Sequence, residues 1–162
     1  MPFSLTSAEA VDILVRLIAS GVGALGFAMM FRTPPKKIPV ATLGGMLTYA
    51  MYAFVIVCGG EVLAASFCSA LVMALFSEIS ARIMRAPAIL FLFSCLIPIV
   101  PGNALYNTMY GLLSYDSEKL LTNAKTAFET VLGIAVGLGV ASIIIGVVLQ
   151  VVKTVKASIK NS

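Results

Sequence analysis

Residues 97–102, which read Ile-Pro-Ile-Val-Pro-Gly, interrupt an apolar stretch that runs from residue 86 to residue 115. The whole stretch is longer than the roughly 20 apolar residues that a helix needs to cross a bilayer core. Each proline lacks a backbone N–H and clashes with the preceding turn, so a helix must break or kink here. Lipid cannot satisfy the backbone groups that such a break leaves unpaired. We therefore expect the break to face protein or a wet cavity inside a membrane protein.

Four further apolar stretches lie on either side of this segment, and each is close to the length of a membrane span. They cover residues 13–31, 38–58, 62–79 and about 130–152. Prolines at 34 and 35 end the first, and Gly59-Gly60 forms a tight turn after the second. The first stretch lacks a basic leader and a cleavage site, so it is expected to be a mature span. The pattern predicts an all-α membrane protein with about five transmembrane helices, the fourth broken at the PxxPG motif, in a single domain over residues 1–162.

The composition agrees with a chain that is solvated by lipid. Hydrophobic residues make up 60% and charged residues 11% of the 162 residues, whereas soluble chains carry roughly 25% charged residues. The mean hydropathy is +1.04. The basic residues adjoin apolar segments and do not form a run with interleaved aromatics, so binding to nucleic acid is excluded.

The residues needed for most catalytic and metal sites are missing from the sequence. There is no histidine, and the three cysteines, Cys58, Cys68 and Cys95, have no CxxC spacing. Zinc, haem and iron–sulfur sites need ligands that this chain does not offer, and a serine triad needs an imidazole. We therefore expect no cofactor, no metal and no enzymatic activity.

The basic residues predict an orientation in the membrane, because cytoplasmic loops are enriched in Lys and Arg. If the N-terminus is outside and the C-terminus cytoplasmic, with the fourth segment crossing once, the inside holds 8 of the 11 basic residues. These are Arg32, Lys36, Lys37, Arg82, Arg85, Lys153, Lys156 and Lys160. The alternative is a re-entrant fourth segment, which would leave the C-terminal tail outside. We expect a multi-pass protein of the cell (inner or plasma) membrane in the first orientation.

The segment after the break is the candidate substrate site. A second half-helix would start at Gly102, and broken helices of this kind bind substrates because their positive ends attract carboxylates. Side chains with amide and phenol groups follow at positions i, i+3, i+4 and i+7, so they share one face. The candidate substrate-binding residues are Pro98, Pro101, Gly102, Asn103, Tyr106, Asn107 and Tyr110. The alternative is a proline kink whose polar stripe packs on another helix.

Three oppositely charged pairs stand four residues apart, a spacing that lets side chains meet on a helix. They are Asp12–Arg16, Glu78–Arg82 and Lys125–Glu129. All lie near span ends, so they can also be ordinary interfacial pairs. Glu78 lies inside an apolar run with Arg82 beside it, which makes this pair a possible coupling site. Since no charge lies near the middle of a span, the chain is either an uncoupled pore or draws its coupling residues from a partner.

Small residues at helix spacing predict close helix packing in the last span. Gly133 and Gly137 form a GxxxG pair, and Ala135 and Gly139 form a second pair one face over. Such pairs let helix backbones approach each other closely. An oligomer or a partner subunit is a plausible use for two faces of this kind.

Three motifs together resemble a known family. Residues 26–34, Gly-Phe-Ala-Met-Met-Phe-Arg-Thr-Pro, close the first span, and Leu43-Gly44-Gly45 opens the second. The third and most specific motif is the IPxxPG break followed by Tyr106 and Met109. This pattern resembles the threonine/serine exporter family in its small split-gene form, over roughly residues 10–150. It is similar to the small subunit of a split succinate exporter.

The resemblance implies an obligate partner, the larger membrane subunit of the same family, with this chain as the C-terminal-half-like subunit. It also implies export of threonine and serine, or of a succinate-like dicarboxylate, driven by proton motive force. The predicted function is thus a subunit of a secondary transporter that exports small carboxylate-bearing metabolites. The alternatives are an assembly subunit that touches no substrate and an uncoupled membrane pore.

Overall fold

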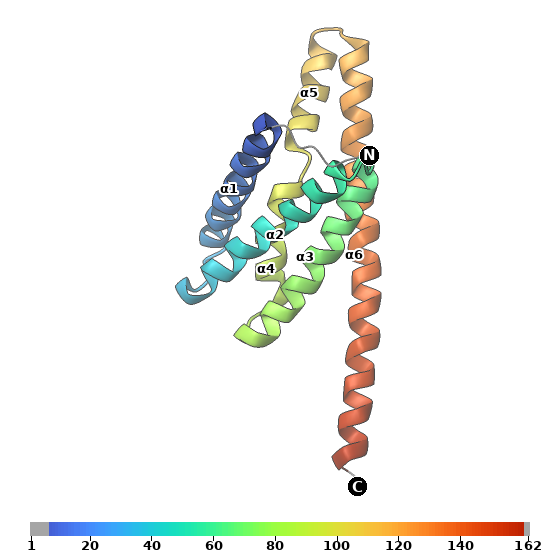
Figure 1. Cartoon of the computed structure of the whole chain (residues 1–162). Coiled ribbons are helices and arrows are strands. Elements are labelled where there is room, and N and C mark those ends of the chain that lie inside the picture. The colour runs from blue at the N-terminus through green and yellow to red at the C-terminus, as the bar shows by residue number, and fades with distance from the viewer. Residues whose placement is uncertain (1–6, 161–162) are drawn as a thin grey trace.

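The computed structural model describes residues 7–160, and every regular element in that range is a helix (Figure 1). The elements are α1 (Ser7–Met30), η1 (Pro35–Lys37), α2 (Ile38–Val57), α3 (Val62–Met84), α4 (Ala88–Leu96), η2 (Ile97–Ile99), α5 (Gly102–Leu113) and α6 (Ser117–Lys160). Within the described residues, four helices are long and apolar enough to cross a membrane, and the bent α4–α5 pair makes a fifth candidate. The predicted fold class is confirmed. Residues 1–6 and 161–162 of the predicted domain lie outside the described range.

Three of the turns between helices use the same C-terminal closure, in which one residue turns left-handed and the next amide bonds back to the helix. The left-handed residues have φ angles of 51°, 49° and 55° and are Arg32, Arg85 and Tyr115. The closing bonds join Thr33 N to Ala28 O (3.0 Å), Ala86 N to Ala81 O (3.0 Å) and Asp116 N to Gly111 O (2.9 Å). Prolines follow the first two turns, so the preceding helices cannot continue.

Helix α6 is longer than the sequence pattern predicts. It begins at Ser117, instead of about residue 130, and contains 44 residues, which corresponds to roughly 66 Å of helix. The polar segment before residue 130 is helical because it contains neither proline nor glycine after Ser117. Asp116 also caps the first turn, since its Oδ1 accepts a hydrogen bond from the Lys119 amide at 3.1 Å.

Helix α3 is the centre of the bundle and packs against α2, α4 and α6. Its seam with α6 is closely packed: a Cβ added to Gly133 would lie 2.7 Å from Leu63 O, and one added to Gly137 would lie 2.7 Å from the Ala70 Cβ. The predicted packing role of the Gly133–Gly137 pair is confirmed. The second small-residue face is open at Gly139, where an added Cβ would have nothing within 4 Å.

Two buried clusters hold the remaining helices together at different levels of the bundle. The first joins α1, α2, α3 and α4 and consists of Ala28, Ala41, Ala81 and Phe91. The second lies near the break and consists of Ala70, Met73, Cys95 and Ile99. The first cluster adjoins the turns that carry Arg32 and Arg85, and the C-terminal end of α6 points toward the same end of the molecule (Figure 1). The basic loops therefore gather at one end, as the orientation argument assumed, while the compartment that this end faces stays a prediction.

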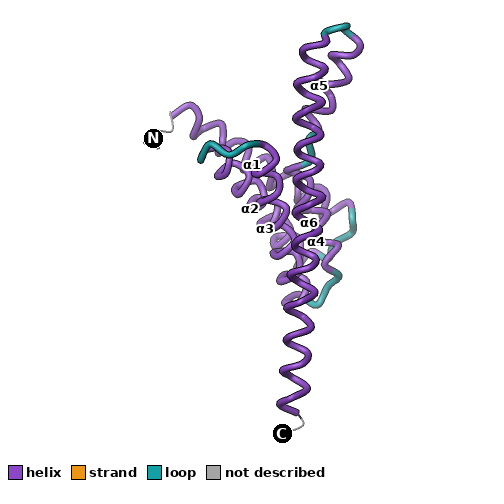
Figure 2. The backbone as a smooth tube through the Cα atoms, turned by 90° about the vertical axis from the view of Figure 1, so that its right-hand side faces the viewer, coloured by secondary structure: helices purple, strands orange, loops and turns teal. Residues whose placement is uncertain are grey.

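Above the break, the chain divides into two arms that diverge (Figure 2). One arm holds the N-terminal part of α1 together with the turn between α2 and α3. The other is the hairpin of α5 and the first part of α6, which rises beyond the other helices (Figure 1). Helix α5 makes its extensive contacts with α6. The break therefore lies where the two arms meet.

Candidate functional site

The break in the fourth span packs against α1 and α2. The two half-helices are bent by 49°, and η2 contacts both α1 and α2. A Cβ added to Gly45 would lie 3.6 Å from Pro98 Cγ, and one added to Gly23 would lie 3.7 Å from the Ile97 side chain. Ile99 is only 4% exposed. The break thus faces protein on this side, as expected for a helix interruption at membrane depth.

The backbone at the break leaves donors free at the start of α5. Val100 N bonds to Ile97 O at 3.3 Å, and Gly102 N bonds to Val100 O at 2.8 Å. For the amides of Asn103 and Ala104, no partner exists among the described residues. These are the unsatisfied N–H groups that every helix N-terminus carries, and they favour negative charge.

The candidate polar face on α5 is continuous and open. The Asn107 Nδ2 atom donates to Asn103 Oδ1 at 3.2 Å, so the two amides form one surface. Tyr106 and Tyr110 extend it and are 69% and 53% exposed. Helix α5 packs on α6 one turn beyond Asn107, where a Cβ added to Gly111 would lie 2.7 Å from the Leu120 amide nitrogen. Pro101 is half-buried, whereas Gly102 is exposed. Within the polar stripe, Asn107 is half-buried at the edge of the α6 contact, whereas Asn103, Tyr106 and Tyr110 are exposed.

The proposed coupling pair lies away from the break. Arg82 donates to Glu78 Oε1 through Nε at 3.0 Å and through Nη2 at 2.7 Å. The pair is near the C-terminal end of α3, and the neighbouring Ala81 belongs to the buried cluster beside the basic loops. The structure does not bring this pair together with the residues of α5.

Sequence reasoning missed a second group of polar residues beside the break. Arg16 Nε donates to Asp12 Oδ2 at 2.8 Å on α1, and α1 packs against α2, which carries Tyr49. The rings of Tyr49 and Tyr52 are stacked with centroids 6.5 Å apart. Tyr52 packs in turn against the cluster that contains Ile99. The spacing of Asp12 and Arg16 was visible in the sequence, but their tyrosine neighbours come from the pairing of two helices.

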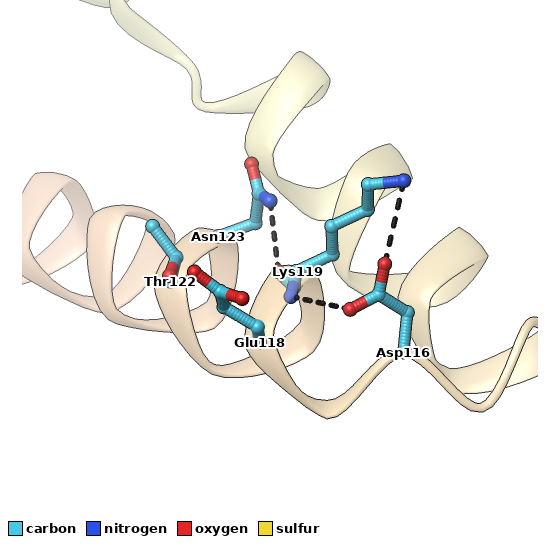
Figure 3. Close-up of a pocket in the computed structure, with 5 residues that line it drawn as sticks. All are labelled: Asp116, Glu118, Lys119, Thr122 and Asn123. Carbon is cyan, nitrogen blue, oxygen red and sulfur yellow. Dashed lines mark hydrogen bonds and ion pairs between the residues drawn. The ribbon is translucent and has the colours of Figure 1, made fainter.

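An open surface pocket lies at the tip of the α5–α6 hairpin, where α6 begins (Figure 3). Its lining residues are Asp116, Glu118, Lys119, Thr122 and Asn123. Lys119 Nζ pairs with Asp116 Oδ2 at 3.3 Å, and Asn123 donates to Lys119 O at 2.8 Å. The backbone N–H of Lys119 lowers the pKa of Asp116, and the Lys119 side chain acts in the same direction. One carboxylate oxygen thus caps α6 and the other pairs with the Lys119 ammonium, which is a structural role.

Comparison with known proteins identifies a family that this chain matches. The family model described as "Threonine/Serine exporter, ThrE" matches residues 16–144. A threonine/serine exporter of Corynebacterium glutamicum is 29% identical over 122 residues, which cover 75% of this chain and 25% of that protein. The chain therefore spans about a quarter of the length of this relative. No solved structure matches the chain.

Proposed function

Because the chain belongs to the threonine/serine exporter family, we propose that it is one subunit of a secondary transporter that exports small carboxylate-bearing metabolites. Family membership makes it a multi-pass membrane component of a transporter and not an enzyme. The observation that carries the proposal is the open polar face of α5, which begins directly at the helix break.

The break and this face offer the groups that bind a carboxylate-bearing solute. The free amides of Asn103 and Ala104 suit a carboxylate at the positive end of α5. Asn103, Tyr106 and Tyr110 add amide and phenol groups that hydrogen-bond hydroxyl or ammonium groups. Threonine, serine and succinate all carry a carboxylate, so all three are substrates to test.

A larger membrane subunit of the same family completes the site in this proposal. The polar face is exposed, whereas broken helix segments are stable at membrane depth only against protein or a wet cavity. The Corynebacterium relative also carries about three quarters of its length outside the region that this chain matches. The partner would cover the exposed side of α5 and enclose the substrate.

Orientation and coupling follow from the charges. With the basic end in the cytoplasm, the N-terminus is outside and the C-terminus inside, as the positive-inside rule favours. Coupling to protons would use Glu78 with Arg82, or residues of the partner. In the structure Glu78 Oε1 accepts hydrogen bonds from both Nε and Nη2 of Arg82.

The test is uptake of labelled serine, threonine and succinate into energised inside-out vesicles. The vesicles carry the chain alone, or the chain together with the proposed larger subunit. We expect uptake that needs both chains and collapses with an uncoupler. Uptake by the chain alone would show that transport needs no partner subunit. Uptake that resists uncouplers would favour an uncoupled pore.

A second candidate function is an assembly subunit that touches no substrate, because the open face of α5 also suits a purely structural contact. Asn103→Ala and Asn107→Ala separate the two functions. Under the leading proposal these variants change the preference among serine, threonine and succinate at normal complex yield. An assembly subunit instead predicts lower complex yield and unchanged preference.

A further inference from the structure

We propose that Asp12 and Arg16 of α1, together with Tyr49 of α2, form a binding site for the charged groups of a zwitterionic amino acid beside the helix break. This inference rests on the proposed transport function and assigns it a site that the α5 face does not include. Arg16 would bind the carboxylate, Asp12 the ammonium group, and the Tyr49 hydroxyl would donate a further hydrogen bond to the carboxylate.

The contact between α1 and α2 puts these residues near the break. A Cβ added to Gly45 would touch the Ala24 Cβ and would lie 3.6 Å from Pro98 Cγ. Tyr49 follows Gly45 by four residues, so it lies about one turn further along the same face of α2. Gly21 opposes Met46 in the same contact, with an added Cβ 2.9 Å from Met46 Cγ. The α1 residues opposite Tyr49 are therefore those about one turn before Ser20, which include Arg16.

Arg16 has unused hydrogen-bonding capacity. Only its Nε donates to Asp12, and its two terminal NH₂ groups have no partner in the part of the chain that the structure describes. Arg82 differs, because it uses Nε and Nη2 together on one carboxylate oxygen. The Arg16 side chain is also 65% exposed. Its planar fork is thus free to bind a second carboxylate in bidentate fashion.

The setting of this ion pair favours a functional role. Asp12 and Arg16 lie inside the candidate span Val11–Met30, and the side chains around them, Val11, Leu14, Val15 and Ile18, are exposed and apolar. Both residues lie in the first two turns of this span, where charged side chains reach the membrane interface, so a solute can approach them from water.

The tyrosines connect this pair to the break. Tyr49 stacks on Tyr52, and Tyr52 packs against the buried cluster that includes Ile99 of η2. A ligand on Arg16 and Tyr49 would therefore contact a continuous set of side chains that ends at the bend. The site is separate from the Asn103–Tyr110 face, because that face belongs to the other arm (Figure 2).

The charge pattern distinguishes between the two substrate classes. A zwitterionic amino acid places one negative and one positive group beside Arg16 and Asp12, so every charge meets its opposite. A dicarboxylate has no group for Asp12, and its second carboxylate would be repelled there. The site therefore favours serine and threonine over succinate, and Asp12 is the residue that sets this preference.

The test is equilibrium binding of labelled L-serine and labelled succinate to the full chain, together with the proposed larger subunit, in lipid nanodiscs. We expect Arg16→Gln to weaken serine binding roughly 10- to 100-fold, because it removes a charge-assisted fork. Asp12→Asn should weaken serine binding roughly 10-fold and leave succinate binding unchanged or tighter. The matched control is Lys125→Gln, which breaks another exposed pair four residues apart and should leave both ligands unaffected.

Arg16→Lys separates loss of binding from a folding defect. Lysine keeps the positive charge beside Asp12 but lacks the planar guanidinium group that binds a carboxylate through two hydrogen bonds. This variant should keep the complex yield of the wild type and still lose serine affinity. Wild-type serine binding in both Arg16→Gln and Asp12→Asn would overturn the site and leave the transport function standing. Binding and transport of succinate but not serine by the wild type would also overturn it. If the wild type binds and moves neither solute, the proposed function fails and this site fails with it.

Discussion

The close contact between α3 and α6 allows a quantitative prediction of the stability lost when Gly133 and Gly137 are substituted. A methyl group on Gly133 would lie 2.7 Å from Leu63 O and 3.1 Å from Phe67 N, and one on Gly137 would lie 2.8 Å from Phe67 O. These neighbours are backbone atoms, so they cannot rotate away and the helices must separate. Overpacking of this kind destabilises by about 1–3 kcal/mol per site.

The double variant Gly133→Ala/Gly137→Ala should therefore be destabilised by up to about 4 kcal/mol, because the helix propensity of alanine offsets about 1 kcal/mol of the overpacking at each site. The two sites share one interface, so their effects are not independent. The assay is unfolding of the purified full chain in mixed micelles, followed by circular dichroism. The control is Gly139→Ala, whose new methyl group would have nothing within 4 Å and which should be neutral or stabilising. Equal stability of the double variant and this control would refute the close seam.

Three further predictions concern the break, the hairpin and the orientation. Replacing both Pro98 and Pro101 by alanine should lower export at normal membrane levels, since a straightened helix loses the free amides; wild-type export rates would remove the break from the mechanism. The pKa of Asp116 is lowered by folding, so its contribution to hairpin stability is complete above the ordinary carboxyl pKa and disappears as the pH falls through the lower folded value. Hydrogen exchange at the start of α6 should follow this loss in the wild type and not in Asp116→Asn. In a background where Cys58, Cys68 and Cys95 are replaced by serine, Lys160→Cys should react with an impermeant label only from the cytoplasmic face, and external labelling would reverse the orientation.

The sequence predicted the features that lipid and proline impose. The length of each apolar stretch is dictated by the thickness of the bilayer core, so every span was placed correctly along the chain, although the start of α6 was not. The break at Pro98 and Pro101 followed from missing amide donors, and the structure has a bend of 49° there. The Gly133–Gly137 contact was also predicted, because two glycines one turn apart let another helix approach.

Features that depend on long-range pairing were not predicted. The start of α6 at Ser117 was not predicted, because the residues before residue 130 are polar and a membrane span is apolar. A polar segment without proline or glycine can nevertheless belong to the same helix. The neighbourhood of Arg16 and Tyr49 depends on the register between α1 and α2, and one sequence does not reveal that register. The exposure of Tyr106 was equally hidden, since spacing defines a face but not what covers it.

The unbroken length of α6 has a mechanical consequence for the whole chain. A straight helix of roughly 66 Å behaves as a rigid lever, and its tight contact with α3 at Gly133 and Gly137 is the natural fulcrum. About 24 Å of the lever lies on the side of Ser117 and about 35 Å on the side of Lys160. A tilt of about 10° would then move the two ends by roughly 4 Å and 6 Å in opposite directions. One small rocking motion at the fulcrum would open one membrane face while closing the other, with no bending of the helix itself.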